Sequence, residues 1–249
     1  DLESIARRMV ADHKGLLAAD ESTGTITKRL SSVNVKSTEE NRRDYRQMLF
    51  QTEGLGQYIS GVILYDETIR QNTVDGIPLT SFLLDQEIMP GIKVDTGAKE
   101  LAGSLDEKVT EGLDGLGERV AEYVTLGAKF AKWRAVISIG DSLPSERCIA
   151  TNAHALARYA RICQEGGLVP IVEPEVLMDG DHSIDRCAEV TDVTLRVVFH
   201  ELFLQKVALE GIILKPNMVI SGKDCLKQAD VAEVAEKTLL TLRRSVPAA

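Results

Sequence analysis

The stretch Gly211-Ile212-Ile213-Leu214-Lys215-Pro216-Asn217-Met218 is apolar up to a single lysine. Its length and its branched aliphatic residues are typical of a buried β-strand. An isolated ammonium group is costly in an apolar interior, so the amine of Lys215 must be paired or must lose its proton. A neutral amine attacks carbonyl groups. The stretch therefore predicts either a structural ion pair or a nucleophilic lysine at the end of a strand.

Five further apolar runs share this design, because each begins with apolar residues and has polar or charged ones toward its end. Segments with helical periodicity lie between the runs, such as residues 37–52, 144–165 and 228–244. The runs begin about 30 to 46 residues apart, which suits βαβ units whose parallel sheet is covered by helices. The expected class is therefore α/β. The five runs are residues 15–20, 61–66, 91–95, 130–136 and 168–175.

Two of the helical segments carry recognisable end signals. Residues 37–52 open with Ser37 and Glu40, whose spacing fits a capping box. Residues 144–165 are followed by Gly166-Gly167, a pair that is typical of the end of a helix. These signals support the division of the chain into alternating strands and helices.

Charged residues gather toward the ends of the apolar runs. Lys132 and Arg134 share one face of their strand, and Glu173 and Glu175 share one face of theirs, because side chains two residues apart point the same way. Either pair alone is also common on a solvated strand. In a (β/α)8 barrel the carboxyl ends of the strands converge on one mouth, whereas a flat doubly wound sheet would spread them in a row. We therefore expect a TIM barrel with a charged mouth.

The number of strands falls short of a closed barrel. About six βα units are visible in the sequence, whereas a (β/α)8 barrel has eight. A six-stranded sheet of this kind would leave two unpaired edges, which is unfavourable and promotes aggregation. The expectation is a single TIM-barrel domain over residues 1–249 that is truncated at its C-terminal end.

Eight short motifs follow one another along the chain. They are Leu17-Ala18-Ala19-Asp20-Glu21-Ser22-Thr23-Gly24, Thr38-Glu39-Glu40-Asn41-Arg42-Arg43, Gly91-Ile92-Lys93-Val94-Asp95, Gly112-Leu113-Asp114-Gly115-Leu116, Phe130-Ala131-Lys132-Trp133-Arg134, Ile171-Val172-Glu173-Pro174-Glu175, Asp179-Gly180-Asp181-His182 and Leu214-Lys215-Pro216-Asn217-Met218. In their order and spacing they resemble the class I, Schiff-base-forming fructose-bisphosphate aldolase family. The resemblance extends over essentially all 249 residues.

This resemblance implies a reversible lyase reaction, in which fructose 1,6-bisphosphate is cleaved to dihydroxyacetone phosphate and glyceraldehyde 3-phosphate. Lys215 matches the lysine that forms an imine with the substrate. Asp20 matches the acid/base that takes the C4 hydroxyl proton, and Glu173 matches the residue that exchanges protons with the carbinolamine. A protonated imine is itself an electron sink for the carbanion, so no metal and no other cofactor are expected.

Further matches imply supporting roles around these three residues. Lys132 matches a second lysine, whose charge would favour the neutral form of Lys215. Glu175 is expected beside the lysines, where it would balance their charge. The remaining matches are expected to bind the substrate and its 6-phosphate through hydroxyl groups and cations, namely Ser22, Thr25, Lys28, Arg29, Lys93 and Arg134.

Two alternatives stay open at this point. Another Schiff-base barrel enzyme, such as a transaldolase or a deoxyribose-phosphate aldolase, would share a strand lysine, although the motifs favour the bisphosphate enzyme. The second alternative is a non-catalytic or inactive aldolase-fold fragment that acts as a binding protein. It is suggested by the absence from these 249 residues of the motifs that hold the 1-phosphate in the family.

Composition and charge limit the partners. The net charge of −9 argues against broad nucleic-acid binding, so any anionic sugar phosphate needs a local cationic pocket. Neither a membrane-spanning apolar segment nor a secretory signal is recognisable, and we expect a cytoplasmic protein. The family further implies sugar bisphosphate and triose phosphates as partners, a homotetramer, and a place in glycolysis or gluconeogenesis.

The cysteines and histidines show no pattern of a metal site. The four cysteines are widely spaced, and three of them fall in helical segments, so we expect free buried thiols rather than disulfides or zinc ligands. The four histidines have no His-Glu-x-x-His spacing, which makes a metal-dependent aldolase unexpected. The cysteines are Cys148, Cys163, Cys187 and Cys225, and the histidines are His13, His154, His182 and His200.

Overall fold

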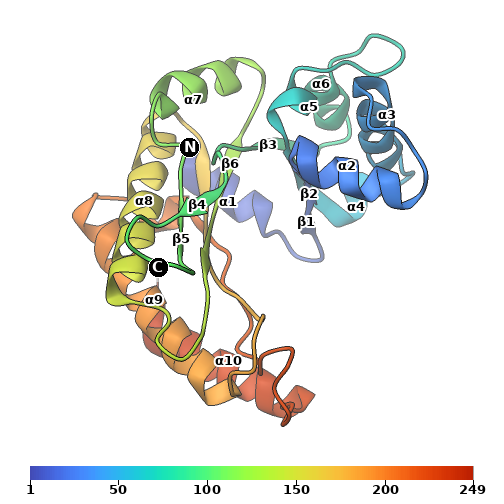
Figure 1. The fold of residues 1–249 in the computed structure, drawn as a ribbon. Helices are drawn as coiled ribbons and strands as arrows, with labels where there is room; N and C mark the ends of the chain where they lie inside the picture. Colours follow the sequence, from blue (N-terminus) through green and yellow to red (C-terminus); the bar gives the residue numbers. More distant parts are fainter. Residues whose placement is uncertain (249) are drawn as a thin grey trace. The chain divides into compact units, whose positions relative to one another are not determined.

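The structure is a computed structural model that describes residues 1–248. Strands and helices alternate along the chain, as the apolar runs predict (Figure 1). The strands found in these residues are β1 (Gly15–Ala19), β2 (Ile59–Leu64), β3 (Met89–Lys93), β4 (Ala98–Glu100), β5 (Lys108–Thr110), β6 (Phe130–Ile137), β7 (Val169–Val176) and β8 (Ile213–Leu214). Six of the strands in residues 1–248 form one sheet in the order β1-β2-β3-β6-β7-β8, so the class is α/β.

Helices fill most of the segments between these strands. Within the described residues they are α1 (Leu2–Met9), α2 (Thr23–Ser32), α3 (Glu39–Phe50), α4 (Leu55–Tyr58), α5 (Asp66–Ile69), α6 (Leu79–Leu84), α7 (Leu116–Thr125), α8 (Glu146–Glu165), α9 (Ile184–Leu204), the 3-10 turn η1 (Leu209–Gly211) and α10 (Val231–Ser245). None of these helices, which all lie in residues 1–248, has both the length and the apolar character that a membrane span requires.

The described chain divides into two compact units. Unit 1 comprises residues 1–94, 117–132 and 163–170, and unit 2 comprises residues 95–116, 133–162 and 171–248. Strands β6 and β7 contribute residues to both units. The single domain over residues 1–249 stays a prediction, and its last residue lies outside the described part of the chain.

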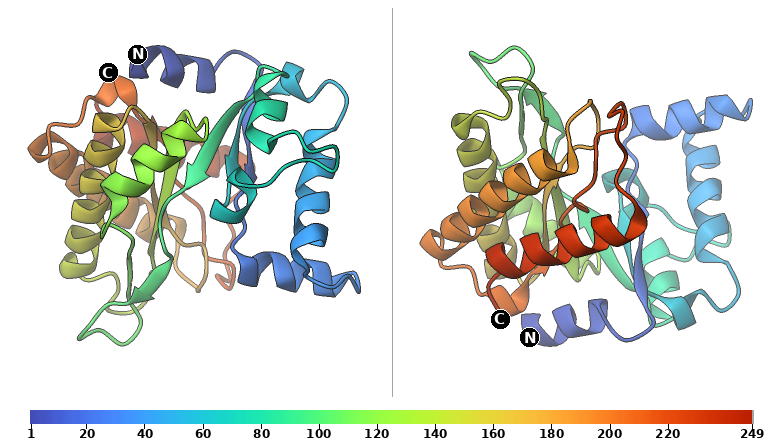
Figure 2. Two further views of the ribbon diagram at one scale, coloured as in Figure 1. Left: turned by 90° about the horizontal axis from the view of Figure 1, so that it is seen from above. Right: turned by 90° about the horizontal axis from the view of Figure 1, so that it is seen from below.

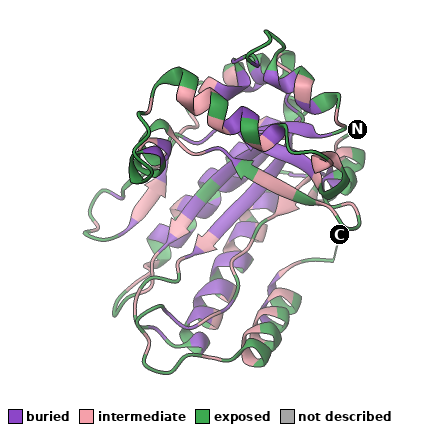
Figure 3. Ribbon diagram, turned by 90° about the vertical axis from the view of Figure 1, so that its right-hand side faces the viewer, coloured by how far each residue is buried: buried purple, intermediate pink, exposed green. Residues whose placement is uncertain are grey.

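Unit 1 is built around parallel strands. Strand β1 pairs with β2, β2 pairs with β3, and β3 pairs with the first residues of β6. Strand β2 is buried from Ser60 to Leu64, as expected for a near-continuous apolar run. Figure 3 shows several strands in purple, which marks buried residues. Gly91 in β3 is required by close packing, because a Cβ atom there would lie 2.2 Å from the ring of buried Phe130.

Unit 2 packs long helices and a short hairpin with strand segments. Buried Trp133 stacks on Tyr159 of α8 with 5.4 Å between ring centroids, and the Tyr159 hydroxyl donates to the carbonyl of Ile171 at 3.1 Å. Strand β7 pairs in parallel with β8, and α10 packs against α9 (Figure 2). The hairpin consists of β4 and β5, which the sequence analysis did not predict.

Element ends differ from the sequence expectations in two places. Helix α3 is capped by Thr38, whose hydroxyl accepts from the backbone N–H of Asn41 at 3.2 Å, so the predicted box of Ser37 and Glu40 is wrong. The hydroxyl of Ser37 instead binds Thr27 and Arg42. The last strand is shorter than predicted, because β8 ends at Leu214.

Several charged residues lie within strands rather than at strand ends, contrary to the prediction. Strand β6 continues to Ile137 and β7 continues to Val176, so Lys132 and Glu173 are interior positions of their strands. The parallel pairing nevertheless places Lys132 and Glu173 beside the ends of neighbouring strands. Lys132 pairs with Lys93, the last residue of β3, and the residue before Glu173 pairs with Leu214, the last residue of β8.

Candidate active site

The end of β1 brings two of the predicted catalytic residues together in unit 1. Asp20 follows β1 directly, and its Oδ2 atom accepts a hydrogen bond from the Lys132 Nζ atom at 3.0 Å. The exposed fractions of the two side chains are 11% and 10%. A charge-assisted hydrogen bond at this depth is screened little by water, so it fixes the carboxylate of Asp20 in one orientation.

A second lysine stands next to this pair. Lys93 ends β3 and is the direct register partner of Lys132 on β6. Partners in register on neighbouring strands place their side chains on the same face of the sheet. Lys93 and Lys132 therefore share one face of the sheet, and Lys132 connects this face to the Asp20 carboxylate.

The start of α2 collects the hydroxyl groups predicted to bind phosphate. Ser22 caps this helix, since its Oγ atom accepts from the Thr25 N–H at 3.4 Å and lies 3.2 Å from the Thr25 hydroxyl. Free N–H groups and the helix dipole favour an anion at such an end. Lys28 and Arg29 are exposed on the same helix, and Arg29 binds the carboxylate of Glu21.

The predicted nucleophile is paired in unit 2. The Lys215 amine donates to Glu173 Oε1 at 2.5 Å, and the Lys215 N–H donates to the Val172 carbonyl at 2.9 Å. The side chain of Glu173 is 4% exposed, whereas that of Lys215 is 56% exposed. The expectation of an amine inside an apolar interior is therefore wrong: Lys215 lies beyond β8, and an accessible amine can meet a substrate carbonyl.

Arg134 and Glu175 form the other predicted pair of unit 2. Their side chains make a direct hydrogen bond from Arg134 Nε to Glu175 Oε2. This bond raises the pKa of the Arg134 guanidinium, with burial acting in the opposite direction. Glu175 was expected beside lysines, but its ion pair in residues 1–248 is with Arg134.

Two residues with no role predicted from the sequence hold these elements in place. Asp95 accepts from the Arg134 N–H at 3.4 Å and from the Gly97 N–H at 3.0 Å. Asn217 accepts from the Val176 N–H at 3.1 Å through its side-chain oxygen, so the segment after Lys215 is tied to β7. Asp95 and Asn217 belong to two of the eight motifs, but the backbone groups that their side chains bind become clear only in the folded chain.

His182 is buried in unit 2 and has no assigned role. It is 8% exposed, and neither ring nitrogen has a hydrogen-bond partner within residues 1–248. Burial lowers the pKa of His182, and Arg186 lowers it further, while the nearby Asp181 raises it. The folded protein therefore favours the neutral imidazole.

We expect this histidine to make stability fall in mildly acidic solution. The unfolded chain binds a proton at His182 below its ordinary pKa of about 6.5, whereas the folded chain resists that proton until a lower pH. The free energy of unfolding should thus be retained above about pH 6.5 and decrease below it. Urea unfolding at a series of pH values from about 5 to about 8 measures how steeply the free energy of unfolding changes with pH.

His182→Phe should flatten the slope, because phenylalanine does not titrate. The matched control is His200→Phe, which removes an exposed histidine from α9 and should leave the slope unchanged. Equal slopes in the wild type and in His182→Phe would contradict the assignment.

No set of three or more His, Cys, Asp or Glu side chains in residues 1–248 is arranged to hold a metal ion. Three of the four cysteines are buried, and the fourth, Cys225, is partly buried; all are free thiols. Burial raises the pKa of the Cys148 thiol to about 11, so this group stays protonated at neutral pH.

Comparison with known proteins identifies the family. The profile of a family described as fructose-bisphosphate aldolase class-I, glycolytic, matches residues 1–249. A probable fructose-bisphosphate aldolase class 1 of Xanthomonas campestris pv. campestris is 61% identical over 99% of this chain and 74% of its own length. Fructose-bisphosphate aldolase 5, cytosolic, of Arabidopsis thaliana is 52% identical over 100% of this chain and 69% of its length.

A solved structure agrees with these relatives. It is a fructose-bisphosphate aldolase of Plasmodium falciparum in complex with TRAP and a small-molecule inhibitor, and it is 49% identical to this chain. The TM-score is 0.97, over 99% of this chain and 72% of that one. The non-catalytic alternative finds no support in these comparisons, and the reaction class is that of a lyase. The chain belongs to the class I fructose-bisphosphate aldolase family.

Proposed function

We propose that this chain cleaves fructose 1,6-bisphosphate through an imine on Lys215. The observation that carries the proposal is the pairing of the half-exposed Lys215 amine with the buried Glu173 carboxylate at 2.5 Å. Transfer of one proton across this short hydrogen bond leaves a neutral amine and a carboxylic acid. The amine then attacks the C2 carbonyl of the open-chain sugar, and its pair of electrons forms the new C–N bond.

Glu173 would complete the formation of the imine. The first adduct is a carbinolamine, and its hydroxyl must leave as water. The carboxylic acid of Glu173 supplies the proton for that water, which regenerates the carboxylate and yields a protonated imine. Because the side chain of Glu173 is 4% exposed, bulk water does not compete strongly for this proton transfer.

Asp20 would perform the cleavage step. Its carboxylate takes the C4 hydroxyl proton, the C3–C4 bond breaks, and glyceraldehyde 3-phosphate leaves. The electron pair of that bond passes into the imine and gives an enamine. Protonation at C3 and hydrolysis then release dihydroxyacetone phosphate. The hydrogen bond from Lys132 at 3.0 Å supports this role, because it orients the carboxylate of Asp20.

The substrate phosphate would be held by the hydroxyl groups at the start of α2 and by cations. Ser22 and Thr25 are together at the helix end, where N–H groups attract an anion. Arg29 and Arg134 already bind carboxylates, so they would exchange these for phosphate oxygens on substrate binding. Lys28 and Lys93 would add positive potential.

Assembly and location are inferred from the family. The parallel strands would belong to a (β/α)8 barrel, and a homotetramer is the expected assembly. A cytoplasmic location in glycolysis or gluconeogenesis is supported by the glycolytic family description and by the cytosolic Arabidopsis relative.

Trapping the imine tests this function. The protein is incubated with dihydroxyacetone phosphate in a buffer with EDTA, reduced with borohydride, and analysed by intact-mass spectrometry and peptide mapping. We expect one adduct per chain, located on Lys215, together with cleavage of fructose 1,6-bisphosphate in the same buffer. An adduct on another lysine, or turnover that requires an added metal ion, would contradict the proposal.

A further inference from the structure

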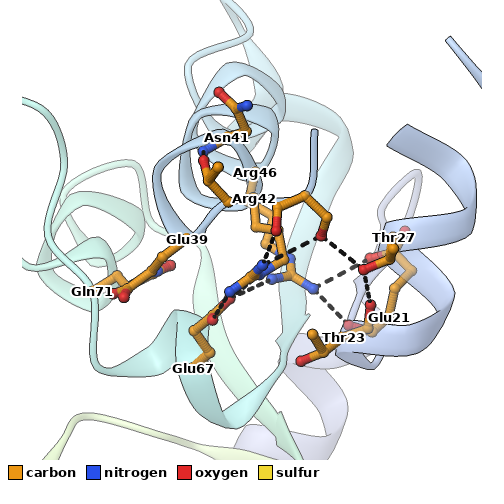
Figure 4. A network of polar contacts seen from close by, with 11 residues as sticks. Glu21, Thr23, Thr27, Glu39, Asn41, Arg42, Arg46, Glu67 and Gln71 are labelled. Carbon is orange, nitrogen blue, oxygen red and sulfur yellow. Dashed lines mark hydrogen bonds and ion pairs between the residues drawn. The ribbon is translucent and has the colours of Figure 1, made fainter. Parts of the chain in front are cut away.

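Four charged side chains form a network in unit 1 that the reaction described above does not use. Figure 4 shows the guanidinium groups of Arg42 and Arg46 between Glu67 on one side and Glu21 on the other. Arg46 lies on α3 and its side chain is 0% exposed, and that of Glu21 is 8% exposed. Arg42 and Glu67 are partly buried at its edge. We call these four residues the buried ion network.

Stability does not explain the burial of Arg46. Burial lowers the pKa of its guanidinium, and the attraction of Glu21 and Glu67 opposes this effect. Its Nε and Nη1 atoms have no hydrogen-bond partner within residues 1–248. Buried ion pairs are often no more stabilising than apolar side chains of similar volume. A buried guanidinium with unused donors therefore calls for a functional reason.

Glu21 connects this network to the reaction. It stands between Asp20, the proposed base, and Ser22, the cap of α2. Its carbonyl oxygen accepts from Arg46 Nη2 at 2.6 Å, which holds the backbone of this turn. Its carboxylate hydrogen-bonds Arg29 and lies 3.9 Å from Arg46 Nη2.

The two cations share the Glu21 carboxylate unequally. In residues 1–248 its ion pairs are with Arg29 and Arg46, and only Arg29 makes a hydrogen bond to it. Its buried Oε2 atom has no hydrogen-bond partner among those residues. The unused Oε2 atom of Glu21 lies 3.9 Å from Arg46 Nη2, a nitrogen that carries two N–H groups and donates one of them to the Glu21 carbonyl.

Arg29 has two competing tasks if it binds the substrate phosphate. When it turns toward phosphate oxygens it leaves a buried carboxylate behind, and an uncompensated buried charge is strongly unfavourable. Arg46 is placed to compensate this charge, because its Nη2 atom lies only 3.9 Å from the Glu21 carboxylate. Glu67 lies 3.8 Å from Arg46 Nη1 and is itself held by Arg42 through two hydrogen bonds of 2.8 and 2.5 Å.

We propose that Arg46 is a positioning residue that takes over the charge of Glu21 when Arg29 leaves Glu21 for the 6-phosphate of the substrate. This inference rests on the proposed function, in which Arg29 binds that phosphate. Without Arg46, Glu21 retains Arg29, and binding of the 6-phosphate is weakened. A substrate that lacks the 6-phosphate does not need the exchange, so its turnover does not depend on Arg46 in this way.

The test compares two substrates in Arg46→Met. Fructose 1,6-bisphosphate carries the 6-phosphate and fructose 1-phosphate lacks it. We expect the ratio of their kcat/KM values to fall about tenfold or more, through a higher KM for the bisphosphate. Arg46→Lys should restore part of the ratio, because it keeps the charge with fewer donors. The matched control, Arg43→Met, removes another α3 guanidinium that binds Asp44, and should leave the ratio unchanged.

A second substitution separates this role from a merely structural one. Adding Glu21→Gln to Arg46→Met removes the buried anion that retains Arg29, so the double variant should recover the ratio of the wild type. Thermal unfolding of every variant shows whether the fold is kept, and Arg46→Lys serves if Arg46→Met does not fold. Equal losses on both substrates, or no recovery in the double variant, would overturn the inference. A wild type that cleaves neither substrate would instead refute the proposed function.

Discussion

Replacing Lys215 with methionine should reduce cleavage of fructose 1,6-bisphosphate by at least about 10⁴-fold, a size typical of the loss of a covalent nucleophile. Methionine has a similar length and no amine, so neither the carbinolamine nor the imine can form. The electron sink for the C3–C4 bond is then lost. We expect no borohydride-reducible adduct with dihydroxyacetone phosphate, and intact mass together with a coupled assay for triose phosphate measures both effects.

The chain offers a closely matched control for this experiment. Lys223 is also an accessible lysine paired with a carboxylate, since its side chain is 52% exposed and its amine lies 2.9 Å from Asp179. Lys223→Met should retain full activity and the adduct on Lys215. Loss of a nucleophile should leave far less than about one hundredth of the wild-type kcat. If Lys215→Met kept more than that, the imine mechanism on this residue would be refuted.

Replacing Asp20 with asparagine should slow cleavage about 10²- to 10⁴-fold, the usual contribution of a positioned general base. Asparagine has almost the same shape, but it cannot accept the C4 hydroxyl proton. It also leaves the buried Lys132 ammonium without the carboxylate that lies 3.0 Å away. The reduction should appear in kcat, measured with saturating fructose 1,6-bisphosphate.

Imine formation should survive in Asp20→Asn, because Lys215 and Glu173 are intact. Borohydride should therefore still trap dihydroxyacetone phosphate on Lys215, which separates this variant from one that has lost its fold. Asp12→Asn is the control, as it removes an exposed carboxylate shortly before β1. A kcat for Asp20→Asn within about twofold of the wild type would exclude Asp20 as the base.

The parallel strands could be predicted from the sequence because burial on both faces demands an uninterrupted apolar run. Each of the runs at residues 15–20, 61–66, 91–95, 130–136 and 168–175 overlaps a strand of the sheet, and the sheet is parallel in every pair described for it. The hairpin of β4 and β5 escaped prediction, since its three-residue strands are too short to show a period.

The site was predicted in part. The Asp20–Lys132 and Lys215–Glu173 pairs join residues that the motifs had selected, and the resemblance to the family carried most of that selection. The exposure of Lys215 could not be foreseen, because apolar neighbours in sequence suggest burial even where the strand has already ended. Glu175 pairs with Arg134 rather than with a lysine, because the two residues lie on the neighbouring strands β7 and β6.

By itself the sequence determined the α/β class and the family, and it selected Lys215 as the amine to test. These follow from local apolar patterns and from motifs that survive in linear order. Only the tertiary structure decided which arginine of α3 is buried. Arg42, Arg43 and Arg46 look alike in sequence, and packing against Glu21 and Glu67 gives them different environments. The burial of these side chains depends on partners more than 20 residues away in the sequence, and the helical period cannot predict such partners.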